Sequence, residues 1–109
     1  GGMSGIHQFC HIGAHSFIAA TSLVLKDVPP YVMASGNTAK PYGLNSEGLK
    51  RRGFTSDAIR AIKQAYRKVY RQGLPLDEAL VEIEENIDSC DELTAFTDFI
   101  QSSNRGIIR

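Results

Sequence analysis

The first part of the chain carries a hydrophobic repeat of six residues. Aliphatic side chains recur at Ile6, Ile12, Ile18 and Val24, and the residue two positions before each of them is Ser or Cys. A spacing of six fits neither the 3.6-residue period of an α-helix nor the two-residue alternation of a strand. It is typical of a parallel β-helix built from hexapeptides, in which each unit forms one side of a triangular coil with its aliphatic side chain inside.

Residues 1–30 make little more than one turn of such a coil. One turn cannot bury its own faces, so we expect this segment to be the last coil or coils of a longer β-helix. Gly13 suits a corner of the coil, where other side chains would crowd. The repeat ends at Pro29 and Pro30, because proline lacks the backbone donor that a stacked strand requires. Residues 31–44 are predicted to be an extended connector.

The remaining segment, 45–109, shows the apolar periodicity of four amphipathic helices. Residues suited to a helix start precede or begin each of them: Asn45, Thr55, Pro75 and Ser89. Ser89 also has Glu92 three positions later, the spacing of a capping box. Short links favour a packed bundle, which would cover the open end of the solenoid. The predicted class is therefore a β-solenoid plus α, ending in a four-helix C-terminal domain.

Composition places the chain among soluble globular proteins and argues against some partners. Twelve basic and twelve acidic residues give a formal net charge of zero, which argues against nucleic acid as a bulk electrostatic partner. No apolar run approaches the length of a membrane span. Cys10 and Cys90 have the spacing of neither a zinc site nor a redox pair, so we expect reduced thiols in a cytoplasmic protein.

The neutral total conceals a separation of charge along the chain. Eight basic residues lie between positions 50 and 71, and nine acidic residues lie between 77 and 98. Four of the basic residues recur at helical spacing on one side of the second predicted helix: Arg60, Lys63, Arg67 and Arg71. This basic face is either plain solvent exposure or a docking surface for an acidic partner.

The densest polar cluster lies on the first predicted helix, at Asn45, Glu47, Arg51 and Arg52. Paired arginines can hold a phosphate group through forked, charge-assisted hydrogen bonds, and Asn and Glu can bond to a base or a sugar hydroxyl. Composition alone favours a solvated helix face over this phosphate site.

Three histidines, His7, His11 and His15, are spaced by four, which would align them on a helix. In a six-residue period the same spacing places each histidine on a different part of the coil, so we expect no metal site. Some hexapeptide proteins are zinc carbonic anhydrases with histidines from different subunits, and bound zinc would favour that alternative. Surface or inter-subunit hydrogen bonding is the preferred interpretation of His11 and His15.

Five stretches, taken in order, resemble the C-terminal part of one family of bacterial enzymes. They are GGMSGIHQFCHIGAH, DVPPYVMASGN, GLNSEGLKRRGF, AFTDF and the terminal RGIIR. The family is the UDP-N-acetylglucosamine 3-O-acyltransferases, which use acyl carrier protein and catalyse the first step of lipid A biosynthesis. The resemblance implies a left-handed parallel β-helix followed by an α-helical domain, assembled as a homotrimer with active sites between neighbouring coils.

The resemblance also implies a reaction and its site residues. A 3-hydroxyacyl chain passes from the phosphopantetheine thioester of acyl carrier protein to the 3-hydroxyl of UDP-N-acetylglucosamine, with no further cofactor. The family's general base is a histidine on an earlier coil, which no residue here matches, so we expect this stretch alone to be inactive. The positions that match the family's sugar-nucleotide contacts are His7, Gln8, Asn45, Glu47, Arg51 and Arg52.

Two further roles follow from the resemblance. Ala20 matches the residue that ends the acyl pocket, and its small side chain predicts a pocket for longer chains. Acyl carrier protein is acidic, so Arg60, Lys63 and Arg67 are expected to help dock it. A hypothesis of a different class is that the 109 residues form a non-catalytic module for nucleotide binding, carrier-protein binding or assembly.

Overall fold

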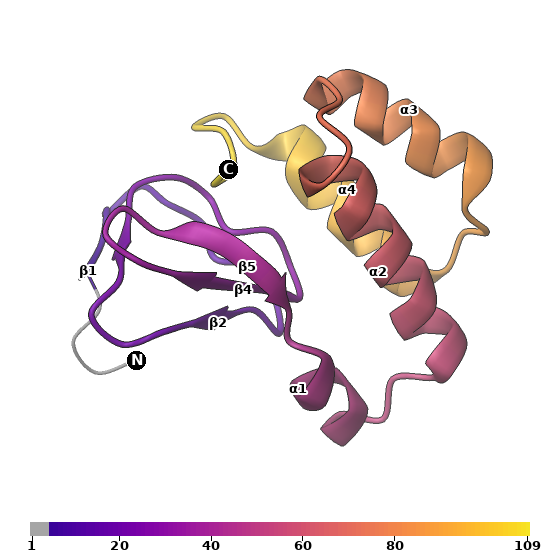
Figure 1. Cartoon of the computed structure of the whole chain (residues 1–109), viewed down its shortest axis with the longest axis horizontal. Helices are drawn as coiled ribbons and strands as arrows, with labels where there is room; N and C mark the ends of the chain where they lie inside the picture. Colours follow the sequence, from indigo (N-terminus) through magenta and orange to yellow (C-terminus); the bar gives the residue numbers. More distant parts are fainter. Residues whose placement is uncertain (1–4) are drawn as a thin grey trace.

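The computed structural model describes residues 5–109, with a coil of short strands on one side and helices on the other (Figure 1). Ser4 of the predicted repeat lies outside the described residues. The strands are β1 (Gly5–Ile6), β2 (Phe17–Ile18), β3 (Leu23–Val24), β4 (Val32–Ser35) and β5 (Lys40–Leu44). The helices are α1 (Ser46–Arg51), α2 (Ser56–Tyr70), α3 (Leu76–Asn86) and α4 (Asp91–Ser102). Within this range no helix has the length and apolar character needed to cross a membrane.

Parallel pairing stacks one turn of the coil on the next. β1 pairs with β3, and β2 pairs with β4. Between these two strand pairs in sequence, Ile12 and Val28 form an isolated parallel bridge. The partners are Gly5 with Leu23, Ile12 with Val28, and Phe17 with Met33. Residues about three hexapeptides apart are therefore neighbours, as the six-residue repeat predicts.

The four aliphatic positions of the repeat differ in burial. Val24 is fully buried and Ile18 is 9% exposed, whereas Ile6 is 48% and Ile12 is 37% exposed. Ile6 and Ile12 are paired in parallel register with the buried Val24 and Val28, so their side chains lie on the same face of the coil as those two residues. Both lie on the first described turn, which has a neighbouring turn on one side only among residues 5–109.

Gly13 lies at a crowded corner of the coil. Its N–H donates to the Val28 carbonyl at 2.7 Å, and the chain beyond Val28 passes directly over it. A Cβ at Gly13 would come within 2.2 Å of the Pro30 nitrogen. The crowding predicted for this corner is confirmed.

The segment after the two prolines consists of two extended strands. β4 pairs antiparallel with β5, with Val32 opposite Leu44 and Ser35 opposite Lys40. The sheet order is β2-β4-β5, so this segment extends one side of the coil toward the helices. β5 then leads directly into α1 (Figure 1).

The helical half is arranged around α2, which contacts α3, α4 and β5. Thr55 caps α2 as predicted, because its hydroxyl accepts a hydrogen bond from the Ala58 N–H at 3.1 Å. The buried face of α2 consists of Ala58, Ile62, Ala65, Tyr66 and Val69. α3 and α4 bury shorter apolar stripes, which include Ile83 and Phe96.

The start of α4 differs from the prediction. The N-cap is Cys90, which has extended backbone angles and makes no side-chain cap hydrogen bond. The capping box predicted for Ser89 and Glu92 is therefore wrong, since Glu92 is the second helical residue and not the third. Asp91 and Glu92 still lie in the first turn, where the helix dipole favours negative charge.

The C-terminal segment returns to the coil. Asp27 makes a parallel bridge with Ile107, and its carbonyl accepts from the Ile108 N–H at 2.9 Å. Ile107 and Ile108 are each 3% exposed. The end of the chain therefore packs against a residue near its beginning.

The carboxylate of Asp27 strengthens this attachment. Asp27 is 1% exposed, and its two oxygens accept hydrogen bonds from the Ser103 hydroxyl at 2.6 Å and the His11 N–H at 2.8 Å. A buried carboxylate requires such partners because burial removes its hydration. Asp27 thus joins the coil to the end of α4.

Candidate functional site

The exposed face of α1 carries the charged side chains that the sequence singles out. Glu47, Arg51 and Arg52 are exposed, whereas Leu49 on the other side of the helix is fully buried. The Glu47 Oε1 lies 4.0 Å from the Lys50 Nζ. Among residues 5–109, no carboxylate forms an ion pair with either arginine. Two adjacent guanidinium groups that are not neutralised can bind a diphosphate.

Asn45 occupies the start of the same helix and is half-buried. Its Oδ1 accepts from the Gly48 N–H at 3.3 Å, and its Nδ2 donates to the His15 carbonyl at 3.1 Å. Its backbone N–H donates to the Tyr31 carbonyl at 2.8 Å. Asn45 is therefore the N-cap of α1, as predicted, and it also connects the helix to the coil.

His7 and Gln8 form a separate group that follows β1. The Nδ1 of His7 accepts from the Phe9 N–H at 3.3 Å, and Gln8 is exposed. Within residues 5–109, no hydrogen bond or ion pair joins His7 or Gln8 to the residues of α1. The predicted nucleotide contacts therefore form two groups in one chain.

Ala20 lies exposed at the turn between β2 and β3. The neighbouring Thr21 has a positive φ of 63°, and its hydroxyl donates to the Ala20 carbonyl at 2.6 Å. A larger side chain here would extend from the surface of the coil.

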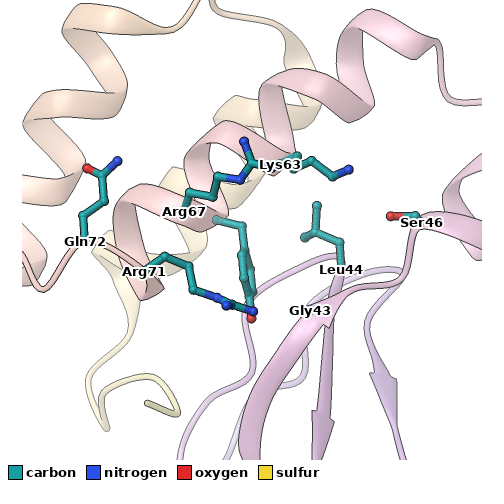
Figure 2. A pocket seen from close by; sticks show the side chains of 8 residues that line it. Gly43, Leu44, Ser46, Lys63, Arg67, Arg71 and Gln72 are labelled. Atoms are coloured by element: carbon teal, nitrogen blue, oxygen red, sulfur yellow. The ribbon is translucent and has the colours of Figure 1, made fainter.

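Three basic side chains line an open pocket of about 620 Å³ between α2 and the end of β5. Figure 2 shows Lys63 and Arg67 on α2 and Arg71 at its C-cap on one side, with Leu44 and Ser46 on the other. The sequence prediction of docking residues did not include Arg71. Its spacing of four residues from Arg67 could have identified it, because residues four apart lie on the same side of a helix. Its guanidinium group lies 6.0 Å from the centroid of the Tyr66 ring.

Arg60 belongs to a second open pocket, of about 600 Å³, together with Lys50, Phe54 and Lys63. Its guanidinium group also lies 3.6 Å from the Asp57 carboxylate on the same helix. Lys63 lines both pockets. The predicted docking residues Arg60, Lys63 and Arg67 therefore cover two adjoining hollows on the basic side of α2.

The three histidines have different surroundings. The Nδ1 of His11 lies 3.8 Å from the Asp27 carboxylate, and the His15 ring stacks on the Tyr31 ring at a centroid distance of 6.2 Å. Within residues 5–109, no three His, Cys, Asp or Glu side chains are grouped so that they could hold a metal ion.

Burial raises the pKa of the Cys10 thiol, which makes it a poor nucleophile.

Comparison with known proteins gives consistent results. A family model described as "Udp N-acetylglucosamine O-acyltransferase; Domain 2" matches residues 27–108. The acyl-(acyl-carrier-protein)–UDP-N-acetylglucosamine O-acyltransferase of Aliivibrio fischeri strain MJ11 is 54% identical over 107 residues, covering 98% of this chain and 41% of the relative. The enzyme of the same name from Burkholderia orbicola strain MC0-3 is 50% identical over 113 residues, covering 100% and 43%.

Solved structures agree with these sequences. LpxA from Acinetobacter baumannii has a TM-score of 0.94 and 44% identity, covering 100% of this chain and 43% of that one. LpxA from Bacteroides fragilis, a UDP-N-acetylglucosamine acyltransferase, has a TM-score of 0.94 and 39% identity, covering 97% and 42%. This chain spans less than half the length of the curated relatives that it matches.

Proposed function

This chain belongs to the UDP-N-acetylglucosamine O-acyltransferase family, and we propose that it is the C-terminal portion of an enzyme that acylates the 3-hydroxyl of UDP-N-acetylglucosamine. The acyl donor is a 3-hydroxyacyl thioester of acyl carrier protein, and the reaction is the first step of lipid A biosynthesis. The observation that carries the proposal is the exposed pair of guanidinium groups at the end of α1, from Arg51 and the C-cap residue Arg52, in a fold shared with solved members of the family.

In this proposal α1 binds the nucleotide. Arg51 and Arg52 neutralise the diphosphate, which otherwise carries its negative charge into the site. Glu47 accepts a hydrogen bond from a sugar or ribose hydroxyl. Asn45 belongs to the same site, at the start of the helix that carries these side chains.

His7 and Gln8 complete the site from a neighbouring copy of the chain. We propose a left-handed parallel β-helix that assembles as a homotrimer, with the nucleotide between coils of adjacent copies. Two features support this arrangement: no hydrogen bond or ion pair joins the two groups of predicted contacts among residues 5–109, and large apolar side chains are exposed on the coil. These side chains are Phe9 and Phe17, which are 64% and 54% exposed.

The catalytic base is not assigned to this chain. In the reaction a general base takes the proton of the 3-hydroxyl as the oxygen attacks the thioester carbonyl. The family's base lies on an earlier coil that no residue here matches, so none of His7, His11 and His15 is proposed for that role. The residues here bind and orient the substrates, and no cofactor is needed beyond the phosphopantetheine thioester.

The acyl and carrier-protein roles are proposed for two other surfaces. Ala20 ends the acyl pocket, and its small side chain suits longer chains. Arg60, Lys63 and Arg67 dock the acidic carrier protein, and Arg71 extends this surface to the C-cap of α2. A cytoplasmic location agrees with Cys10 and Cys90, which are both free thiols.

Acyl transfer by the full-length enzyme tests the proposal. Arg51→Ala and Arg52→Ala should each raise the KM for UDP-N-acetylglucosamine by about ten- to a hundredfold, because each removes charge-assisted hydrogen bonds to phosphate. Lys68→Ala is the control, because it removes a basic side chain that pairs with Glu82 of α3 outside the proposed nucleotide site, and it should change this KM little. Full-length enzyme that transfers no acyl group to UDP-N-acetylglucosamine, or arginine variants with unchanged KM, would overturn the proposal.

A further inference from the structure

The turn that carries the first group of predicted nucleotide contacts follows β1. The Cys10 N–H donates to the His7 carbonyl at 2.9 Å and closes this turn, so Gln8 and Phe9 lie at its tip, where both are exposed. The start of the turn is held on the coil, because the His7 N–H donates to the Val24 carbonyl at 2.9 Å. The backbone of the turn is therefore fixed, and the direction of the His7 ring depends on its side-chain contacts.

Phe9 contacts the His7 side chain in two ways. Its N–H donates to the His7 Nδ1 at 3.3 Å, and the centroid of its ring lies 5.8 Å from the centroid of the His7 ring. A ring nitrogen that accepts a hydrogen bond carries no proton, so in the neutral imidazole the proton is on Nε2. Phe9 thus favours the form of His7 in which the Nε2–H can donate to a phosphate or sugar oxygen.

The C-terminal segment places a cation over the Phe9 ring. The guanidinium group of Arg105 lies 6.0 Å from the centroid of this ring, within the range of a cation–π interaction. Among residues 5–109, no carboxylate forms an ion pair with Arg105, so its charge is not neutralised by a closer partner. Phe9 and Arg105 also line one open hollow of about 480 Å³, together with His11 and Asn104. The end of the chain therefore lies beside the turn that carries His7.

One buried carboxylate holds both the turn and the C-terminal segment. The Oδ1 of Asp27 accepts from the His11 N–H directly after the turn, and its Oδ2 accepts from the Ser103 hydroxyl. The Ser103 Oγ also accepts from the Gly106 N–H at 3.1 Å, and the Gly106 carbonyl accepts from the Asp27 N–H at 2.9 Å. Arg105 lies between these two attached residues, so its backbone is fixed relative to the turn.

We propose that Arg105 is a positioning residue for the nucleotide sugar: it holds the Phe9 ring, which keeps the His7 imidazole oriented as an Nε2–H donor. This inference rests on the sugar-nucleotide role proposed above for His7. An imidazole that already has the bound orientation and tautomer loses less freedom on binding, so the affinity for the ligand is higher. Arg105 acts through Phe9 and makes no contact with the ligand.

Steady-state kinetics of the full-length enzyme test the inference. Arg105→Ala should raise the KM for UDP-N-acetylglucosamine about three- to fivefold, with little change in kcat or in the KM for acyl carrier protein, because an exposed cation–π contact is weak. Arg109→Ala is the matched control: it removes the same charge from the same segment, and the Arg109 guanidinium group donates to the Leu74 carbonyl at 3.4 Å. An unchanged KM in Arg105→Ala, or equal rises in both variants, would overturn the inference.

A second substitution separates positioning from direct contact with the ligand. Phe9→Leu removes the aromatic ring and keeps an apolar side chain and the backbone N–H. In a Phe9→Leu background, Arg105→Ala should have almost no further effect on the KM for UDP-N-acetylglucosamine, because the ring through which Arg105 acts is gone. A further rise of the same size in that background would show that Arg105 touches the ligand, which contradicts a positioning role.

The His7 tautomer separates this inference from the proposed function, because it is measured without ligand. In full-length enzyme that carries ¹⁵N-labelled histidine, the His7 signals are assigned by their loss in His7→Gln. In mildly alkaline buffer, wild type and Arg109→Ala should show His7 protonated at Nε2, and Arg105→Ala should show a larger share of the Nδ1-protonated form.

An unchanged His7 spectrum in Arg105→Ala would overturn the positioning role even if the enzyme uses UDP-N-acetylglucosamine. If the wild-type enzyme does not use that substrate, the proposed function fails, and the spectrum alone decides whether Arg105 positions His7.

Discussion

Two tyrosine hydroxyls are buried, and only one of them has a hydrogen-bond partner among residues 5–109. The Tyr31 hydroxyl donates to the Glu92 carbonyl, whereas the Tyr70 hydroxyl is buried without a hydrogen-bond partner within residues 5–109. Burial is the largest cause that raises the pKa of each phenol, to about 12 for Tyr31. Burial therefore favours the neutral form of both phenols in the folded protein.

The raised Tyr31 pKa predicts a loss of stability in alkaline solution. Its usual value is 10.0, so between this pH and about 12 the unfolded chain releases a proton that the folded chain retains. The free energy of unfolding should be independent of this group below pH 10 and fall as the pH rises to about 12. Unfolding of Tyr31→Phe measured over this range should show a smaller fall, and an equal fall in both proteins would contradict the prediction.

Ala20 is the residue that should set the length of the acyl chain. In the proposed function Ala20 ends the acyl pocket, so the longer side chain of Ala20→Met should shorten that pocket and shift the preference of the full-length enzyme toward shorter acyl donors. A long acyl chain would then bury a few methylene groups fewer, so the ratio of kcat/KM between long and short acyl donors should change about tenfold or more. Competition between acyl carrier proteins that carry long and short chains measures the shift, and an unchanged preference would contradict the role of Ala20.

Helix starts decide stability at the scale of single elements. The Thr55 hydroxyl caps α2, whereas Ser89 precedes the Cys90 cap of α4 and makes no side-chain hydrogen bond among residues 5–109. Thr55→Ala should therefore lower the free energy of unfolding by about 1 kcal/mol, and Ser89→Ala by less than about 0.5 kcal/mol. Chemical unfolding of the two variants measures the difference; a larger cost for Ser89→Ala would contradict the observed cap.

The basic side of α2 should control association with the carrier protein. Lys63→Gln and Arg67→Gln should each raise the KM for acyl carrier protein several-fold, more strongly at low salt, because exposed charges attract over distances that salt shortens. Lys68→Gln is the matched control, since Lys68 points to Glu82 of α3 at 3.8 Å. An equal effect of all three substitutions would indicate a general loss of charge, and no effect would refute docking at this face.

Helix and repeat patterns could be predicted because they depend on neighbours in the sequence. The six-residue repeat indicated the parallel pairing of the coil, and the Thr55 cap followed from the residues around it. The α4 cap could not be fixed in this way, because Ser89 and Cys90 are adjacent and only the backbone angles decide which one ends the extended segment. The exposure of Ile6 depends on whether a second turn lies above it, which the local pattern does not record.

At the scale of the whole molecule, the least predictable contacts join distant segments. α1 could be recognised from its charged residues, but its attachment to His15 depends on a carbonyl thirty residues away in sequence. The sequence around Asp27 likewise gives no sign of Ser103, which lies 76 residues later. Single polar residues of this kind have no periodicity, so only the folded chain reveals their partners.

The Asp27–Ser103 contact should hold the end of the chain in place. Ser103→Ala removes a hydrogen bond to a buried carboxylate and should cost about 2 kcal/mol of unfolding free energy, with faster amide exchange at Ile108. Ser102→Ala is the matched control, because its hydroxyl donates to the Phe99 carbonyl at an exposed position. Similar exchange at Ile108 in both variants would contradict the prediction.

The return of residues 106–108 to Asp27 has a consequence for how copies of this chain can meet. The helices leave the coil after β5 and come back to it at Ile107, so both ends of the helical segment attach to the same coil (Figure 1). Exchange of helices between two copies would require both attachments to break and cross together. Domain swapping has a low free-energy cost when the exchanged segment is attached through a single hinge. Each copy should therefore keep its own helices when copies associate.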